Sequence, residues 1–285
     1  IPLLSSQILQ DKTGTVDGKI WELNNGIENF EAMDFIHCEG MVTSFQGNLQ
    51  MNISRVRVSQ EGEYDPADYL PMSRKDIDEM YEELLKYMRK VKNPYLLKLA
   101  ESFFVENEAF IRLFKKHSAA KSVHHGFVGG LLEHTLSVVK LCDFYADQYD
   151  FLNRDLLITA AMFHDIGKTK ELSAFPANDY TDDGQLLGHI VIGVELVGLG
   201  IRRIPDFPKR LASELKHCIV AHHGELEYGS PKKPALAEAA ALNFADNTDA
   251  RMETFREILT GSATTDEWLG YNRFVDSNVR RTTEF

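Results

Sequence analysis

Two patterns of hydrophobic and polar positions divide the chain. Residues 1–60 contain short stretches, such as residues 49–53, in which apolar and polar side chains alternate, and this period of two is typical of β-strands. From about residue 73 to about residue 260, apolar residues recur every three to four positions, which is typical of amphipathic helices. The pattern predicts an α+β protein with a small β-domain followed by an all-α helical bundle.

Turn signals between the alternating stretches predict two hairpins in the β-part. One turn is expected at residues 11–14 and another at residues 46–48. About four strands can be counted in residues 1–60. The segment LQDKTGTVDGKIW, residues 9–21, resembles the second and third strands of an OB-fold, a five-stranded Greek-key barrel that binds nucleic acid. The resemblance implies an OB-type barrel in which one strand is not evident from the sequence.

Aromatic and basic residues of this β-part are candidates for binding a single strand. Trp21 and Phe45 are available to stack on bases, and Arg55 and Arg57 to contact phosphates. The alternative, which is favoured for each residue taken singly, is that the aromatic side chains belong to the barrel core and the arginines are solvated.

The region between the β-part and residue 117 is predicted to be structural, and it contains no candidate catalytic or metal-binding residues. Residues 60–72 are a polar linker with two prolines. Ser73 and Asp76 have the form of a capping box that opens a helix. Asn93-Pro94 starts a second helix, and helical patterning continues to about residue 116.

From residue 118 to residue 260, one helix after another brings a histidine or aspartate to its apolar face. Leu131, His134 and Val138 share one helical face, and Leu157, Ala161 and His164 share another. The same arrangement recurs after the break expected at Gly188 and in two later helices. The residues capable of binding a metal are His134, His164, Asp165, His189, His222 and Asp246.

Each of these residues, taken alone, is most often a core histidine bonded to backbone or a capping aspartate. Taken together, four imidazoles and two carboxylates buried without strong partners would cost several kcal/mol per ionised group. One or two divalent cations would satisfy them all. Imidazole and carboxylate ligands suit Mn²⁺, Fe²⁺, Zn²⁺ or Mg²⁺. A cysteine zinc site is excluded, because Cys38, Cys142 and Cys218 are widely scattered.

The order of these residues resembles the HD-domain phosphohydrolases, which have a first His, a His-Asp pair and a distant Asp. Within that superfamily the chain resembles the YhaM/CMP-binding-factor family in the segments HHGFVGGLLEHT, HDIGKTKEL, GHI, HHGELEYGSPKKP and ADNTDARM. That family consists of bacterial 3′→5′ exoribonucleases with an OB-fold before the HD domain. The resemblance implies a Mn²⁺-dependent nuclease acting on single-stranded RNA, with single-stranded DNA as a further partner, that releases nucleoside monophosphates.

On this basis we expect the following division of the chain. Residues 1–60 form the OB-fold-like domain and residues 61–117 the linker and helical scaffold. Residues 118–260 form the HD domain, and residues 261–285 are a C-terminal tail that folds back on this subunit or on a neighbouring one in a homo-oligomer.

The resemblance also suggests roles for individual residues. Asp165 is expected to bridge two ions or to orient the nucleophile. Lys168 either stabilises negative charge on a phosphoryl oxygen or is a solvated lysine favoured by the helix dipole. His125 and His223 are candidates for protonating the leaving group or contacting phosphate, and His223 is alternatively a further metal ligand. Lys121 could steer the anionic strand toward the site.

The charge, the apolar runs and the cysteines of the chain limit the kinds of partner and compartment that we expect. The net charge of −12 means that nucleic acid must bind at a local surface and not over the whole protein. No uninterrupted apolar run approaches the roughly 18 residues that span a bilayer, so no membrane partner is expected. Three scattered cysteines are typical of reduced thiols in the cytoplasm.

Two other functions compete with the nuclease. One is an HD phosphohydrolase of mononucleotides or cyclic dinucleotides, which would have no need for a strand-binding module. The other is a nucleic-acid-binding factor whose HD domain is only structural. The complete set of His and Asp residues is hard to explain in such a factor.

Overall fold

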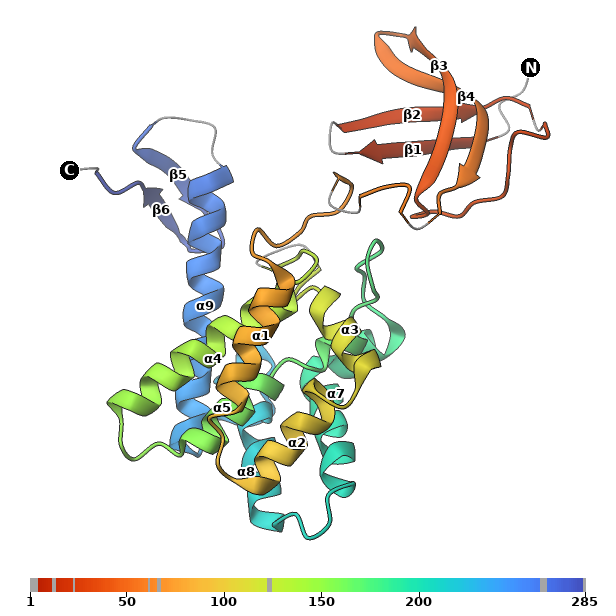
Figure 1. Ribbon diagram of the computed structural model, residues 1–285. Coiled ribbons are helices and arrows are strands. Elements are labelled where there is room, and N and C mark those ends of the chain that lie inside the picture. Colours follow the sequence, from red (N-terminus) through yellow and green to blue (C-terminus); the bar gives the residue numbers. More distant parts are fainter. Residues whose placement is uncertain are drawn as a thin grey trace. The chain divides into compact units, whose positions relative to one another are not determined.

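The computed structural model describes residues 5–11, 14–22, 24–60, 62–65, 68–121, 125–261 and 266–283. The chain forms two compact units, Ile1–Pro71 and Met72–Phe285. The first is a β-sheet and the second is largely helical (Figure 1). This agrees with the α+β class expected from the two hydrophobic patterns.

The sheet unit contains the two hairpins that the turn signals predict. Its strands are β1 (Ser5–Asp11), β2 (Gly14–Ile20), β3 (Ile36–Phe45) and β4 (Asn48–Val58). β1 pairs antiparallel with β2, and β3 pairs antiparallel with β4. β2 and β4 run parallel, which gives the sheet order β1-β2-β4-β3. Lys12 and Thr13 of the first predicted turn lie outside the described residues.

The sheet is open, which corrects the expectation of a barrel. In the described part of the chain β1 and β3 are edge strands, and no fifth strand joins them. The buried apolar core of this unit consists of Ile20, Ile53 and Val56, with partly buried neighbours packed around it. A core this small covers one face of a curved sheet and does not fill a closed barrel.

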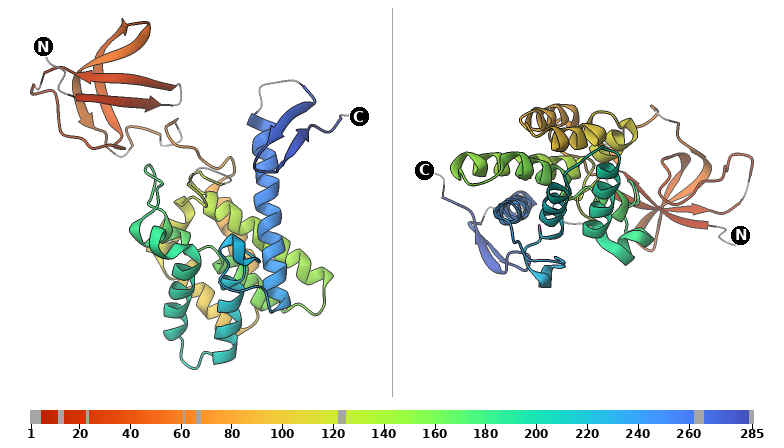
Figure 2. Two further views of the ribbon diagram at one scale, coloured as in Figure 1. Left: turned by 180° about the vertical axis from the view of Figure 1, so that it is seen from behind. Right: turned by 90° about the horizontal axis from the view of Figure 1, so that it is seen from below.

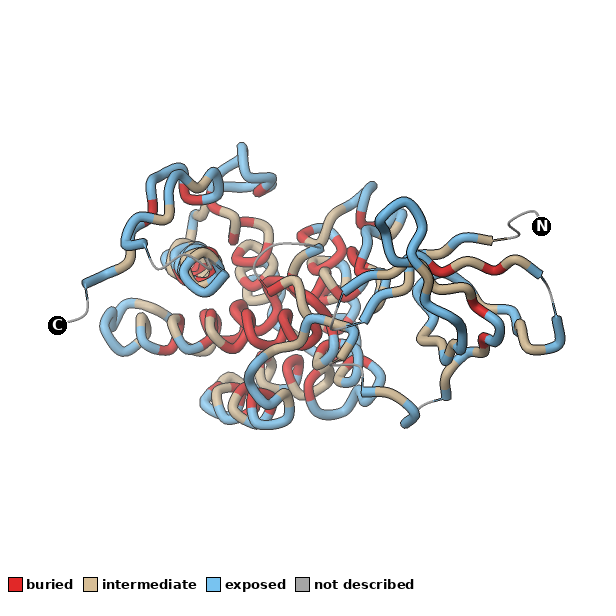
Figure 3. Tube along the Cα trace, turned by 90° about the horizontal axis from the view of Figure 1, so that it is seen from above, coloured by how far each residue is buried: buried red, intermediate tan, exposed pale blue. Residues whose placement is uncertain are grey.

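The helical unit is built around one large core. Its elements are α1 (Ile77–Met88), α2 (Pro94–Phe104), α3 (Glu108–Lys116), α4 (Gly130–Gln148), α5 (Arg154–Phe163), α6 (Lys168–Glu171), α7 (Asp182–Arg202), α8 (Lys209–Val220), the 3₁₀ helix Leu226–Tyr228 and α9 (Ala237–Gly261). Every residue of α5 from Leu156 to Phe163 is buried. Figure 3 shows buried positions concentrated in this unit. Helices α1 to α3 share the core with the later helices, so they are part of the same bundle.

The helix starts follow local capping chemistry, with one correction. Asp76 caps α1, because its carboxylate accepts from the backbone N–H groups of Asp78 and Glu79, each at 2.9 Å. Ser73, which was expected to act in a capping box, instead donates its hydroxyl to Glu133 at 2.6 Å. α2 starts as expected, with Asn93 as the cap and Pro94 at its first position.

Helix α7 is the one helix in the described residues that is long and apolar enough to cross a membrane by length and composition. Gly188 interrupts it with a φ of 72°. The regular part after this kink, residues 189–202, is about 21 Å long, which is shorter than the roughly 30 Å of a hydrocarbon core. Val197, one of its buried residues, belongs to the core of the bundle.

The C-terminal segment forms a hairpin that the sequence patterns do not predict. After α9, strands β5 (Trp268–Asn272) and β6 (Ser277–Arg280) pair antiparallel, and both lie near the C-terminal end of α9 (Figure 2). Val275 and Val279 are its buried residues.

Candidate metal centre

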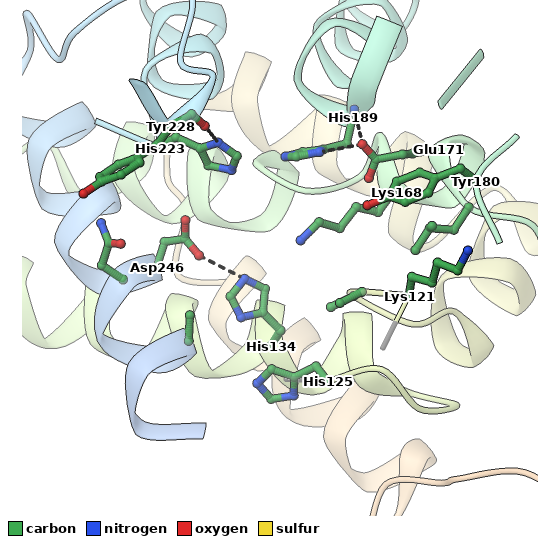
Figure 4. Close-up of a pocket in the computed structure, with 15 residues that line it drawn as sticks. Lys121, His125, His134, Lys168, Glu171, Tyr180, His189, His223, Tyr228 and Asp246 are labelled. Carbon is green, nitrogen blue, oxygen red and sulfur yellow. Dashed lines mark hydrogen bonds and ion pairs between the residues drawn. The ribbon is translucent and has the colours of Figure 1, made fainter. Parts of the chain in front are cut away.

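Five helices and the residues that follow or interrupt them bring the six predicted metal-binding residues together. His134 lies within α4, and His164 and Asp165 follow the last residue of α5. His189 is the first residue after the kink of α7, and His222 follows α8. Asp246 lies within α9. Figure 4 shows His134, His189 and Asp246 facing one cavity from different elements.

One group of atoms gathers around the Nε2 atom of His134. This atom lies 3.1 Å from Nε2 of His164. It lies 3.2 Å from Oδ1 of Asp246 and 3.4 Å from Oδ2 of Asp165. All of these side chains except that of Asp246 are 5% exposed or less. Imidazole and carboxylate atoms so close together form a donor set for one divalent cation.

A second group gathers around the other oxygen of Asp165. Oδ1 of Asp165 lies 3.5 Å from Nε2 of His189 and 3.6 Å from Nε2 of His222. These three atoms are buried without a hydrogen-bond partner. His223 lies beside them, and its ligand atom, with those of His189 and His222, falls within a 4.8 Å cluster. Unsatisfied buried acceptors are costly, so the residues fit a second cation.

The opposite nitrogen of each histidine is already committed to a partner. Nδ1 of His164 donates to the carbonyl of Ala161 at 2.7 Å, and Nδ1 of His222 donates to the carbonyl of Ile219 at 2.7 Å. A histidine that donates from Nδ1 carries its lone pair on Nε2 in the neutral form, which is the form that binds metals.

Residues 131–251 match the family model of the HD domain. This part of the chain is an HD domain. The match starts at the beginning of α4 and ends within α9, so it contains all six predicted ligands and excludes the sheet unit, α1 to α3 and the C-terminal hairpin. No solved structure matches the chain. The domain and its buried His and Asp clusters are those of a metal-dependent phosphohydrolase.

Two carboxylates of the HD domain that the sequence reasoning missed support the ligand histidines. Oδ2 of Asp249 lies 2.7 Å from Nδ1 of His134 and 2.9 Å from Nε2 of His125. Oε1 of Glu171 accepts from Nδ1 of His189 at 3.0 Å and from its backbone N–H at 2.9 Å. Asp249 could have been found, because it follows Asp246 by three residues and shares its helix face. No local pattern pairs Glu171 with a histidine of another helix.

Gly167, which follows the His-Asp pair after one residue, lies at a close approach of two backbone segments. It does not have the left-handed conformation common for glycine at a helix end, since its φ is −60°. A Cβ atom there would lie 1.9 Å from the carbonyl oxygen of His189. Gly167 is therefore required because α6 and α7 approach closely at this point, which brings Asp165 and His189 to the same site.

Lys168 is held inside the site. Its Nζ donates to Oδ2 of Asp165 at 2.6 Å, and its side chain is 17% exposed. Burial by itself would lower the pKa of Lys168, but the adjacent carboxylate of Asp165 outweighs it and raises the pKa above the usual value. Lys168 is thus a cation beside the ligand atoms, and it lines the cavity.

The charges of the remaining groups suit metal ligation. Burial, followed by the neighbouring His223, holds the pKa of His222 well below its usual value, and burial lowers the pKa of His164. Burial also opposes the ionised form of Asp246, but hydrogen bonding to His134 prevails and lowers its pKa. His164 and His222 are therefore neutral imidazoles beside an ionised Asp246 at neutral pH. Burial by itself would lower the pKa of His134, but hydrogen bonding to Asp165, Asp246 and Asp249 outweighs it and raises that pKa well above its usual value. A cation bound by His134 would displace this proton.

The cavity above these atoms has a volume of about 390 Å³, within the range of small-molecule sites. His125 lines it and is buried, and His223 lines it with its Nδ1 bonded to the carbonyl of Tyr228 at 2.8 Å. Lys121 lies at its rim and forms an ion pair with Asp179 at 2.6 Å.

The other predicted substrate-binding residues lie in the sheet unit. Nε1 of Trp21 donates to Asn52 at 2.8 Å. Arg57 donates two hydrogen bonds to Glu63, at 2.7 and 2.9 Å. Arg55 is 71% exposed and lies 4.0 Å from Glu39. Phe45, which was favoured as core, is 61% exposed.

Proposed function

We propose that this protein is a metal-dependent 3′→5′ exoribonuclease that shortens single-stranded RNA to nucleoside monophosphates. The observation that carries the hydrolytic part is Asp165, whose two oxygens face two groups of histidine nitrogens. One histidine of each group, His134 and His189, lines the cavity. The RNA substrate and the direction of digestion are supported by the segments that resemble the YhaM/CMP-binding-factor family.

The donor atoms indicate how ions would be held. Asp165 Oδ2 would hold one divalent ion together with His134, His164 and Asp246. Asp165 Oδ1 would hold a second with His189 and His222. Ions at such sites lower the pKa of water and neutralise phosphoryl charge.

Side chains lining the cavity supply the remaining chemistry. The Lys168 ammonium lies beside Asp165 and is positioned to stabilise a phosphoryl oxygen. His223 is partly exposed, and its Nδ1 is bonded to backbone, so its Nε2 is the atom available to a leaving group or a phosphate. His125 is hydrogen-bonded to Asp249, and its side chain forms part of the cavity wall.

The sheet unit supports a role in holding the strand. Phe45 on β3 and Arg55 on β4 are both exposed, as a stacking residue and a phosphate contact must be. Arg57 is engaged by Glu63, so it contributes less free positive charge. Single-stranded DNA would bind the same surface, because stacking and phosphate contacts do not depend on the sugar.

One assay separates this proposal from its competitors. The purified protein is incubated with Mn²⁺ and 5′-labelled single-stranded RNA, and in parallel with nucleotides and cyclic dinucleotides. Stepwise shortening of the RNA from its 3′ end is expected. Turnover of the small nucleotides alone would identify a nucleotide phosphohydrolase, and RNA binding without hydrolysis would identify a binding factor.

The metal-site part has its own test. Asp165→Ala should abolish hydrolysis and reduce Mn²⁺ binding, because it removes an oxygen from each group. Asp150→Ala, at an exposed position outside the cavity, is the control. Full activity of Asp165→Ala would show that hydrolysis does not use this centre.

A further inference from the structure

Tyr228 combines high exposure with a place on the wall of the metal-site cavity. Its side chain lines the cavity and is 70% exposed. It is the last residue of the 3₁₀ helix Leu226–Tyr228, a few residues after the ligand-bearing pair His222-His223. A large aromatic ring left uncovered forgoes the stabilisation of burial, so its position beside a charged site is a candidate for ligand contact.

The backbone that carries this ring is fixed to the metal centre. The carbonyl of Tyr228 accepts from Nδ1 of His223 at 2.8 Å. Ser230, two residues later, donates its hydroxyl to the carbonyl of Val220 at the end of α8, also at 2.8 Å. Gly229, with a φ of 84°, ends the 3₁₀ helix. The backbone that carries the ring is therefore held at a defined place relative to His222 and His223, while the surface of the ring stays open.

The opposite wall of the cavity has a different character. There Tyr180 is 45% exposed, and Nζ of Lys121 lies 6.0 Å from its ring centroid. Lys121 is in turn paired with Asp179. In Figure 4, Tyr228 and Tyr180 lie on opposite sides of His134, and Lys168 lies between the two tyrosines. A phosphate bound near Lys168 would thus have an uncovered aromatic ring on one side and a cation-paired one on the other.

We infer that Tyr228 is a base-stacking residue that holds the nucleobase of one of the two nucleotides joined by the bond to be cut. This inference rests on the proposed function, because it assigns a subsite to the same phosphodiester reaction. A phosphate near Lys168 places the nucleosides on its two sides within the cavity. Every base has a π-face, so stacking on Tyr228 accepts any of them, as a nuclease that digests successive nucleotides requires.

The test compares substrates with and without a base. Oligoribonucleotides that lack the base at the last or at the next-to-last position are digested by the wild type, Tyr228→Ala and Tyr228→Trp. The wild type is expected to show a KM about 10-fold higher for one of the two abasic substrates. Tyr228→Ala should raise KM on normal RNA about 10-fold and lose this difference, with kcat little changed. Tyr228→Trp should keep it.

A matched control and a binding measurement complete the test. Tyr149→Ala removes another exposed tyrosine, outside the cavity, and should behave as the wild type. With Mn²⁺ present, AMP should bind the wild type about 10-fold more tightly than ribose 5-phosphate, and Tyr228→Ala should bind both equally. Tyr228→Ala that keeps both discriminations would overturn the inference. A wild type that prefers AMP but leaves RNA intact would instead contradict the exoribonuclease function alone.

Discussion

The histidines of the centre are each oriented by what their second nitrogen contacts. His164 and His222 donate to carbonyls of their own helices, three residues earlier. His189 and His134 are held by the carboxylates of Glu171 and Asp249. A carboxylate partner strengthens the basicity of the ligand nitrogen as well as fixing the ring. The carboxylates are therefore predicted to affect metal affinity although they are not ligands.

Asp249→Asn should weaken binding of Mn²⁺ about 10- to 100-fold. The amide cannot accept from His125 and His134 with the charge of a carboxylate, so the His134 ring loses both orientation and basicity. Isothermal titration calorimetry of the metal-free protein measures the change.

The matched control is Asp150→Asn, which changes an exposed aspartate in the same way. Its affinity for Mn²⁺ should equal that of the wild type. If Asp249→Asn bound Mn²⁺ as tightly as the control, the carboxylate would have no part in holding His134.

The sequence predicts which residues meet in the centre better than it predicts how they are held. A histidine on an apolar helix face must point into the core. For this reason the sequence predicts that His134, His164, His189 and His222 lie together. The carboxylate of Glu171 reaches His189 across the contact between α6 and α7. Such a contact depends on tertiary packing and leaves no trace in the period of either helix.

Among the elements, α6 and α7 approach each other closely, backbone to backbone, near the centre. Gly167 lies against the carbonyl of His189, where a Cβ atom would meet an oxygen at 1.9 Å and the backbone nitrogen of Gly193 at 2.8 Å. Backbone atoms cannot move aside as a flexible side chain can. The packing of these two elements therefore depends on this glycine.

Gly167→Ala should lower the free energy of unfolding by about 3 kcal/mol, because overpacking against backbone forces the elements apart. Urea denaturation of the purified protein measures this. Gly261→Ala, at the end of α9 with open space around its position, should change stability little. Equal stability of the two variants would contradict a close approach at Gly167.

In the sheet unit, the ion pair of Arg57 with Glu63 predicts a dependence on acid pH. Hydrogen bonding to Arg57 lowers the pKa of Glu63 from 4.5 to about 2. A carboxyl whose pKa is lowered by folding stabilises the fold above its unfolded pKa, and this contribution is lost as the pH falls from about 4.5 toward 2. The pair should therefore stabilise the sheet at neutral pH and not at pH 2.

The comparison of wild type with Glu63→Gln tests this. The stability difference between them, followed by NMR signals of β4 in acid titration, should be constant above about pH 5 and vanish near pH 2. Glu31→Gln, at an exposed position of the same unit, is the control. A difference that did not change with pH would exclude the ionised Glu63 as its source.

Local sequence signals predicted many of the helices and strands, but they did not predict which strands pair at the edges of the sheets. Turn residues fixed both hairpins of the sheet, and Asn93-Pro94 fixed the start of α2, because these features depend on neighbouring residues. The opening of the sheet and the β5–β6 hairpin were not predicted. They depend on which strand edges find partners, and single-strand patterns do not encode that.

For the whole molecule, the proposed function assigns holding of the strand to one of the two units and hydrolysis to the other. Ile1–Pro71 has its own small core, and Met72–Phe285 contains all six predicted ligands and a core of its own. The net charge of −12 is unfavourable for binding a polyanion, so local contacts must overcome it.

Deletion of residues 1–71 should therefore weaken binding of long RNA and leave hydrolysis of a short substrate unchanged. The slope of affinity against salt should also become smaller, because phosphate contacts are lost. Fluorescence anisotropy at several salt concentrations measures both. Unchanged affinity for long RNA would show that the sheet unit does not bind the strand.

The ligands come from helices that are far apart in the sequence, from His134 in α4 to Asp246 in α9. Such a site exists only when these helices are packed together. Opening of any one of them would release a ligand. A bound ion would favour the closed state of all of them, since it binds the folded form alone. Metal would thus link helices that are distant in the sequence into one cooperative unit, and protection of their amides against hydrogen exchange would report that link.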